Sequence, residues 1–166
     1  AIYGLQRIGN AADGAAIRPL LNDPDPWVGR TAAIALGKLR DAGSAEALVG
    51  VLNADDLHLR YEAFIALARI GEPRTQKAIL AAMDDPRLWT DLASWDQAAL
   101  VNVIDRPWFT DPAAKDLLLW LLDYGDWEHP ELAGLEPNHQ KSAVLLIANR
   151  AAEILAVKFG DASGVE

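Results

Sequence analysis

RTAAIALGKL, residues 30–39, is the stretch that decides the fold, because its pattern recurs at a fixed step along the chain. Leu5, Leu36 and Leu67 are 31 residues apart (36 − 5 and 67 − 36). Three further columns keep this step, and a single helix cannot align four columns over such a distance. The sequence therefore predicts a repeat protein built from a supersecondary unit. The other columns are Ile8/Leu39/Ile70, Ala1/Ala32/Ala63 and the basic column Arg7/Lys38/Arg69.

Each repeat is expected to contain two helices. The second helices are expected at 26–39 and 57–70, because Asp25 and Asp56 stand where an aspartate caps a helix N-terminus. The first helices are expected at about 13–22, 44–53 and 75–84, with a bend at Pro19 in the earliest one. Three residues that share one column are the candidate caps of these first helices. They are Asp13, Ser44 and Thr75.

Two segments carry a resemblance to a known family. DPDPWVGRTAAIALGKLRD at 23–41, followed by LHLRYEAFIALARIGE at 57–72, resembles the HEAT-like repeats of the phycobilin lyase type. The resemblance covers about residues 1–89 and implies stacked antiparallel helix pairs. Members of that family include protein-binding scaffolds, chromophore lyases and a hydroxylase, so the fold does not fix a function.

The sequence departs from this family at two places. The family's arginine at the third position of the second helix is present as Arg60, but Gly29 replaces it in the preceding repeat. Members with a di-iron centre carry His-Glu pairs on these helices, whereas this sequence has Tyr61 and Glu62 there. A di-iron hydroxylase is therefore disfavoured.

The 31-residue pattern weakens after Asp85. Residues 90–104 are expected to form a degenerate second helix of a third repeat, and strong helices are expected at 112–124 and 138–159. We therefore expect an all-α, right-handed α-solenoid of HEAT-like helix pairs over 1–104, with its first repeat incomplete. Because terminal repeats must close a stack, 105–166 is expected to form a divergent helical C-terminal cap.

Composition limits the classes of function. With 51% hydrophobic residues among 166, the chain is expected to be ordered, and no apolar run is long enough to cross a bilayer. The net charge of −9 argues against nucleic acid as a partner. The absence of cysteine excludes disulfides and thiolate metal sites. No signal peptide is visible, and a cytoplasmic protein is expected.

The beginning of the sequence leads to a separate hypothesis. The chain starts at Ala1, in the middle of a repeat, so we expect a fragment or a processed product. Ile2, Leu5 and Ile8 would then form a face that stacks on missing repeats or on another copy of the chain.

The columns left after the core is assigned are expected to line the concave face of the second helices. They combine aromatic and aliphatic residues with cations, which are types enriched where interfaces carry energy. Basic residues alone are better explained as partners of helix C-termini, but the combination favours a partner-binding surface. The candidate residues are Tyr3, Arg7, Trp27, Arg30, Ile34, Lys38, His58, Tyr61, Ile65, Arg69 and Trp89.

Two groups contain residue types that bind metals. His58 and Glu62 are one turn apart after Asp55 and Asp56, but a capped helix with an exposed ion pair explains them equally well. The second group has no ligand spacing, and a solvated loop is favoured for it. It comprises Glu128, His129, Glu131, Glu136 and His139. We expect no metal, no cofactor and no catalytic residue.

The sequence favours a non-enzymatic interaction module that binds an acidic or amphipathic protein segment on its concave face. One alternative is a protein resembling the chromophore lyases, which would hold a linear tetrapyrrole with its propionates on Arg30, Lys38 or Arg69. A third hypothesis is a HEAT-like binder of DNA lesions, against which the net charge counts.

Overall fold

The computed structural model describes residues 13–85, 87–124 and 137–160. Every regular element in these residues is a helix, so the predicted all-α class is confirmed. The chain divides into two compact units, Ala1–Asp85 and Pro86–Glu166. The division between repeats and cap at 104/105 stays a prediction.

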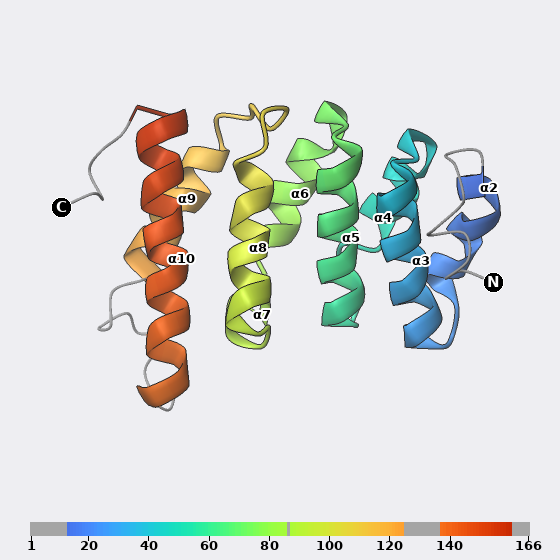
Figure 1. The fold of residues 1–166 in the computed structure, drawn as a ribbon, viewed down its shortest axis with the longest axis horizontal. Coiled ribbons are helices and arrows are strands. Elements are labelled where there is room, and N and C mark those ends of the chain that lie inside the picture. The colour runs from blue at the N-terminus through green and yellow to red at the C-terminus, as the bar shows by residue number, and fades with distance from the viewer. Residues whose placement is uncertain (1–12, 86, 125–136, 161–166) are drawn as a thin grey trace. The chain divides into compact units, whose positions relative to one another are not determined.

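The second helices of the first unit have the predicted bounds. α3 spans Pro26–Leu39 and α5 spans Leu57–Ile70, and the two helices pack side by side (Figure 1). Each helix begins at an aspartate cap and ends at a residue in the left-handed conformation, Arg40 after α3 and Gly71 after α5. The caps and the ends lie 31 residues apart, so the sequence repeat is also a repeat of backbone conformation.

Small residues bring α3 and α5 close together. At Gly37, a Cβ atom would lie only 2.6 Å from Cα of Ala66. Ala32, Ala63 and Ala66 are fully buried, as their positions in the repeat predicted. Side chains of this size allow helix axes to approach toward the close end of the usual range, about 8 Å.

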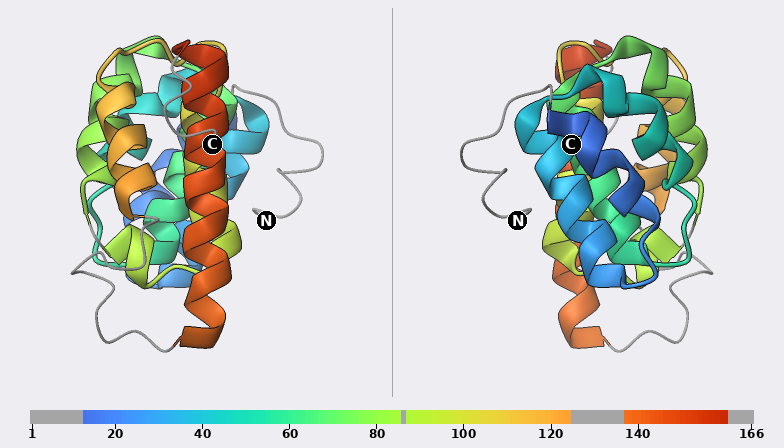
Figure 2. Two further views of the ribbon diagram at one scale, coloured as in Figure 1. Left: turned by 90° about the vertical axis from the view of Figure 1, so that its left-hand side faces the viewer. Right: turned by 90° about the vertical axis from the view of Figure 1, so that its right-hand side faces the viewer.

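The first helices of the repeats are partly 3₁₀ rather than continuous α-helices. They form a layer of their own, and α4 and α6 lie behind α3 and α5 in Figure 1, with the same two layers visible in Figure 2. The chain changes from α to 3₁₀ one residue before Pro19, where the sequence predicted a bend. The bend itself stays a prediction. The elements are α2 Gly14–Ile17, η2 Arg18–Asn22, η3 Ala42–Ser44, α4 Ala45–Gly50, η4 Pro73–Thr75 and α6 Gln76–Met83.

The expected caps of the first helices are wrong in their chemistry. Asp13, Ser44 and Thr75 stand at the N-cap positions, but none of their side chains accepts a hydrogen bond from the helix. The Thr75 hydroxyl instead donates to the carbonyl of Glu72. The Ser44 hydroxyl donates to Asp41 and accepts from Arg18 Nε at 2.9 Å. Both hydroxyls therefore stabilise the loop before their helix, and that of Ser44 also links two successive repeats.

Arg60 is the most deeply buried charged residue of the described first unit, with its side chain 1% exposed. Its Nε donates to the carbonyl of Leu52 at 2.6 Å, and Nη2 donates to that of Ala82 at 3.2 Å. Nη1 pairs with Asp85 at 2.7 Å. The guanidinium thus joins α5 to the ends of both neighbouring first helices, which is the arrangement that makes a buried cation tolerable.

The second unit is also helical. α10 packs against both α8 and α9, and Arg150 of α10 donates to Asn102 and pairs with Asp105. Lys158 donates to the carbonyls of Ile104 and Arg106, and so caps the C-terminal end of α8. The expected helix at 90–104 is instead split into two helices. The elements are α7 Arg87–Thr90, α8 Ser94–Ile104, α9 Ala114–Tyr124 and α10 Pro137–Lys158.

Candidate functional site

The beginning of α3 presents an exposed tryptophan. Asp25 caps the helix by accepting from the backbone N–H of Trp27 at 3.0 Å, and Pro26 occupies the first helical position, as predicted. The Thr31 hydroxyl donates to the carbonyl of Trp27 at 2.7 Å. The backbone is therefore held at both sides of Trp27, while its side chain remains 62% exposed.

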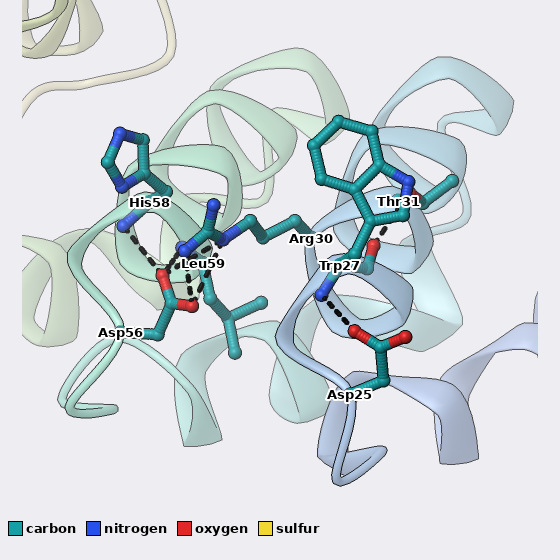
Figure 3. A network of polar contacts seen from close by, with 7 residues as sticks. All are labelled: Asp25, Trp27, Arg30, Thr31, Asp56, His58 and Leu59. Carbon is teal, nitrogen blue, oxygen red and sulfur yellow. Dashed lines mark hydrogen bonds and ion pairs between the residues drawn. The ribbon is translucent and has the colours of Figure 1, made fainter.

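The beginning of α5 is joined to α3 by an ion pair. Asp56 Oδ1 accepts from the backbone N–H groups of His58 and Leu59, both at 2.9 Å, which caps α5. Arg30 of α3 donates to the same carboxylate from Nε and Nη2, the latter at 2.6 Å (Figure 3). Such a two-pronged contact fixes the guanidinium in one orientation.

Several effects act on the acidity of Asp56. Burial is the largest and raises the pKa of Asp56, because it disfavours the charged form. The hydrogen bond from Arg30, those from the backbone of Leu59 and His58, and the charge of Arg30 act in the opposite direction. Together they bring the pKa of Asp56 below its ordinary value of 3.8, so the cap and the ion pair are fully formed at neutral pH.

A pocket of about 310 Å³ lies between α3 and α5, and Arg30 of this ion pair is part of its lining. In Figure 3 the indole of Trp27 and the imidazole of His58 stand on either side of Arg30. The pocket is mostly apolar, with charged groups among its lining. The lining residues are Trp27, Arg30, Thr31, Ile34, Lys38, His58 and Glu62.

Three polar groups of this lining are available to a ligand. In the described part of the chain, the indole N–H of Trp27 and the imidazole of His58 have no hydrogen-bond partner. Arg30 uses Nε and Nη2 for Asp56, which leaves Nη1 unengaged by the described residues. The site therefore offers hydrogen-bond donors beside an apolar surface, which is a common composition of binding pockets.

The structure brings five of the predicted site residues together. Tyr61 and Ile65 are half-buried and Arg69 is exposed, and none of the three lines the pocket. Tyr3 and Arg7 lie outside the described residues. The five that line the pocket are Trp27, Arg30, Ile34, Lys38 and His58.

The expected exposure of Trp89 is wrong. Its side chain is 3% exposed and packs against Trp120 of the same unit, with ring centroids 6.4 Å apart. Its carbonyl accepts from Gln97 at 2.8 Å. The reason is that the repeat pattern has ended here, so Trp89 lies in the short α7 and not at the start of a long second helix.

Two lining residues were missed by the sequence reasoning. Thr31 and Glu62 are 31 residues apart (62 − 31) and so form a column that the same pattern contains. Thr31 follows Arg30 and Glu62 follows Tyr61, and Arg30 and Tyr61 form one of the candidate columns. The 31-residue spacing could therefore have identified Thr31 and Glu62 as well. The described residues include no cluster of three or more metal-ligating side chains, so His58 and Glu62 have no third ligand there. The second acidic and histidine group lies outside the part of the chain whose side chains are described.

No helix in the described segments has both the length and the apolar character of a membrane span. No curated protein matches the sequence. The family model of HEAT repeats matches residues 1–57 and 14–100, which together cover more than half of the chain. These matched residues include both helices of the pocket. The chain belongs to the HEAT-repeat family.

Proposed function

We propose that this protein is a non-enzymatic interaction module that binds a segment of a partner protein on the exposed face of α3 and α5. The observation that carries the proposal is Trp27, whose large apolar side chain is 62% exposed and lines a pocket of about 310 Å³. Exposing an indole to water is unfavourable, and tryptophan is enriched among the residues that dominate interface energies.

The surroundings of the pocket support an acidic or amphipathic segment as the partner. Lys38 lines the pocket and is exposed, and Arg69 is exposed further along α5. Ile34 adds apolar surface to the same lining. HEAT repeats in general mediate protein–protein interaction, which agrees with this use of the surface. Ile2, Leu5 and Ile8, the residues expected to stack on further repeats or on another copy, lie outside the described residues, so this stacking stays a prediction. A cytoplasmic location stays a prediction as well.

The alternative of a bilin ligand has less support. A linear tetrapyrrole carries four rings, whereas the pocket lies at the lower end of the 300–1,000 Å³ that small-molecule sites typically span. Arg30, one of the residues expected to hold a propionate, is already bound to Asp56 through two of its nitrogens. Binding of DNA lesions would have to overcome the net charge of −9.

The test is a selection of binding peptides from a random library displayed on phage, with the full chain immobilised. The dissociation constant of each selected peptide is then measured for the parent protein and for Trp27→Ala. We expect a loss of at least about tenfold, the effect of a hot-spot residue. Trp95→Ala is the matched control, because Trp95 is 79% exposed but lies on α8.

The outcomes separate the hypotheses. Selected peptides that bind both tryptophan variants as tightly as the parent, or a selection that enriches no peptide, would refute the proposal. A shifted absorption band after mixing the chain with a linear tetrapyrrole would favour the chromophore-binding alternative. Salt-dependent retention of DNA on a filter would favour the third hypothesis, a binder of DNA lesions.

A further inference from the structure

We infer that the pocket between α3 and α5 takes one neutral, apolar side chain of the bound segment, and that the indole N–H of Trp27 donates to a main-chain carbonyl beside it. The inference rests on the proposed function and specifies the chemistry of the anchor residue. Leucine or an aromatic residue fits this description.

The charges of the site favour a neutral anchor. The lining contains the two cations Arg30 and Lys38 and the anion Glu62, and Asp56 is bound to Arg30. The formal charges of these four residues add to zero. A charged anchor would lose its hydration on entry without meeting a net counter-charge, and that loss is costly. An apolar anchor loses no such hydration and gains from burial.

The size of the site favours a single side chain. A volume of about 310 Å³ is near the lower limit of pockets that hold small molecules. Trp27 and His58 stand on either side of Arg30 (Figure 3), and Ile34 contributes an aliphatic surface. Because Arg30 is held by Asp56, this part of the pocket is preformed and does not have to be ordered on binding.

The polar groups of the site favour a peptide backbone next to the anchor. The indole N–H of Trp27 has no partner in the described residues, and Nη1 of Arg30 has none there either. Both groups are donors only, so they call for an acceptor. An anchor residue in an extended segment brings backbone carbonyls with it. A partner that left these donors buried and unpaired would bind more weakly.

Capped amino acids test the inference directly. The probes are the N-acetyl amides of leucine, tryptophan, glutamate, lysine and glycine, added to the ¹⁵N-labelled full chain. Each of the six tryptophan indoles contributes one N–H signal to the NMR spectrum, and Trp27→Phe identifies the signal of Trp27. We expect the leucine and tryptophan amides to shift the Trp27 indole signal saturably, with half-saturation on the order of millimolar for ligands of this size.

The other three amides are the comparison within the same experiment. We expect the glutamate, lysine and glycine amides to leave the Trp27 signal in place at the same concentrations, and all five amides to leave the Trp95 signal in place. Ile34→Gln, which makes the pocket wall polar, is expected to abolish the leucine shift. Its backbone amide spectrum reports whether the fold is kept.

Several results would overturn the inference. Saturable binding of the glutamate or lysine amide would make the pocket a site for a charged anchor. No shift of the Trp27 indole by any amide would show that the pocket takes no side chain. Neither result decides the proposed function, which is tested separately by the selected peptides. Peptides that need Trp27 but contain an essential charged anchor would contradict the inference while supporting the interaction module.

Discussion

Arg30 and Asp56 bind each other across two successive repeats, and the carboxylate that holds the guanidinium also caps α5. One aspartate therefore connects the position of the pocket's cation to the start of the next helix. A change at Arg30 would disturb the cap's environment as well as the pocket. Arg30→Glu would place two carboxylates together, so it is expected to lower stability and is a poor test of binding.

Substitutions of Asp56 separate the two roles of its carboxylate. Asp56→Ala removes the cap and the ion pair and is expected to lower the free energy of unfolding by about 1–3 kcal/mol. Asp56→Asn keeps an effective cap and should cost less than about 1 kcal/mol, because the ion pair is partly exposed. Urea unfolding measures both. Asp25→Ala is the control. It removes the cap of α3, and Asp25 has no ion pair in the described residues, so it measures the loss of a cap alone. Equal losses for the two Asp56 variants would contradict a capping role.

The ion pair between Arg30 and Asp56 also makes the free energy of unfolding depend on pH. The pKa of Asp56 is lowered in the folded state, so its stabilisation is fully present above the unfolded value, near 3.8, and is lost as the pH falls through the lower folded value. The difference in unfolding free energy between the parent and Asp56→Asn is therefore expected to be constant near neutrality and to shrink below pH ~4. A difference that stays constant down to pH ~2 would be inconsistent with the lowered pKa.

The bounds of α3 and α5 could be predicted to the residue because their signals are local. Asp25 and Asp56 cap the helices through their own backbone neighbours, and the 31-residue step aligns the two copies. The hydroxyls of Ser44 and Thr75 could not be assigned in this way. Their partners are a guanidinium 26 residues away for Ser44 and a loop carbonyl for Thr75, and spacing does not reveal those contacts.

The columns of the repeat included five residues that line the pocket, but they did not predict how exposed each candidate is. Arg30 is on the side of α3 that faces α5, where it meets Asp56. Tyr61 has the same place in its repeat, but it is half-buried and does not line the pocket. Two columns, Trp27/His58 and Thr31/Glu62, line the pocket from both helices. Arg30, Ile34 and Lys38 line it from α3 alone, so equivalent positions of the repeat do not always share a site.

Arg60 is expected to be important for stability, because three groups depend on its guanidinium. Arg60→Ala would leave Asp85 and the carbonyls of Leu52 and Ala82 without this partner, at a cost of about 3 kcal/mol. Arg60→Lys should recover only part of this loss, since a single ammonium cannot reproduce the planar fork. Urea unfolding is again the measurement. Asp85→Asn is the matched control and should cost about 1 kcal/mol, because both carbonyl contacts remain.

Gly37 and Gly50 allow the close packing of α3 and α5 to be tested with one type of substitution. Both residues lie in helices, where alanine is favoured over glycine by about 1 kcal/mol. A Cβ at Gly50 would meet no atom within 4 Å, so Gly50→Ala is expected to stabilise the protein. A Cβ at Gly37 would lie 2.8 Å from the Cβ of Ala66, and Gly37→Ala should instead destabilise by about 1–3 kcal/mol. Thermal unfolding of both variants decides the matter. If Gly37→Ala were as stabilising as Gly50→Ala, the two helices would have to lie further apart, and the pocket between them would have a different shape.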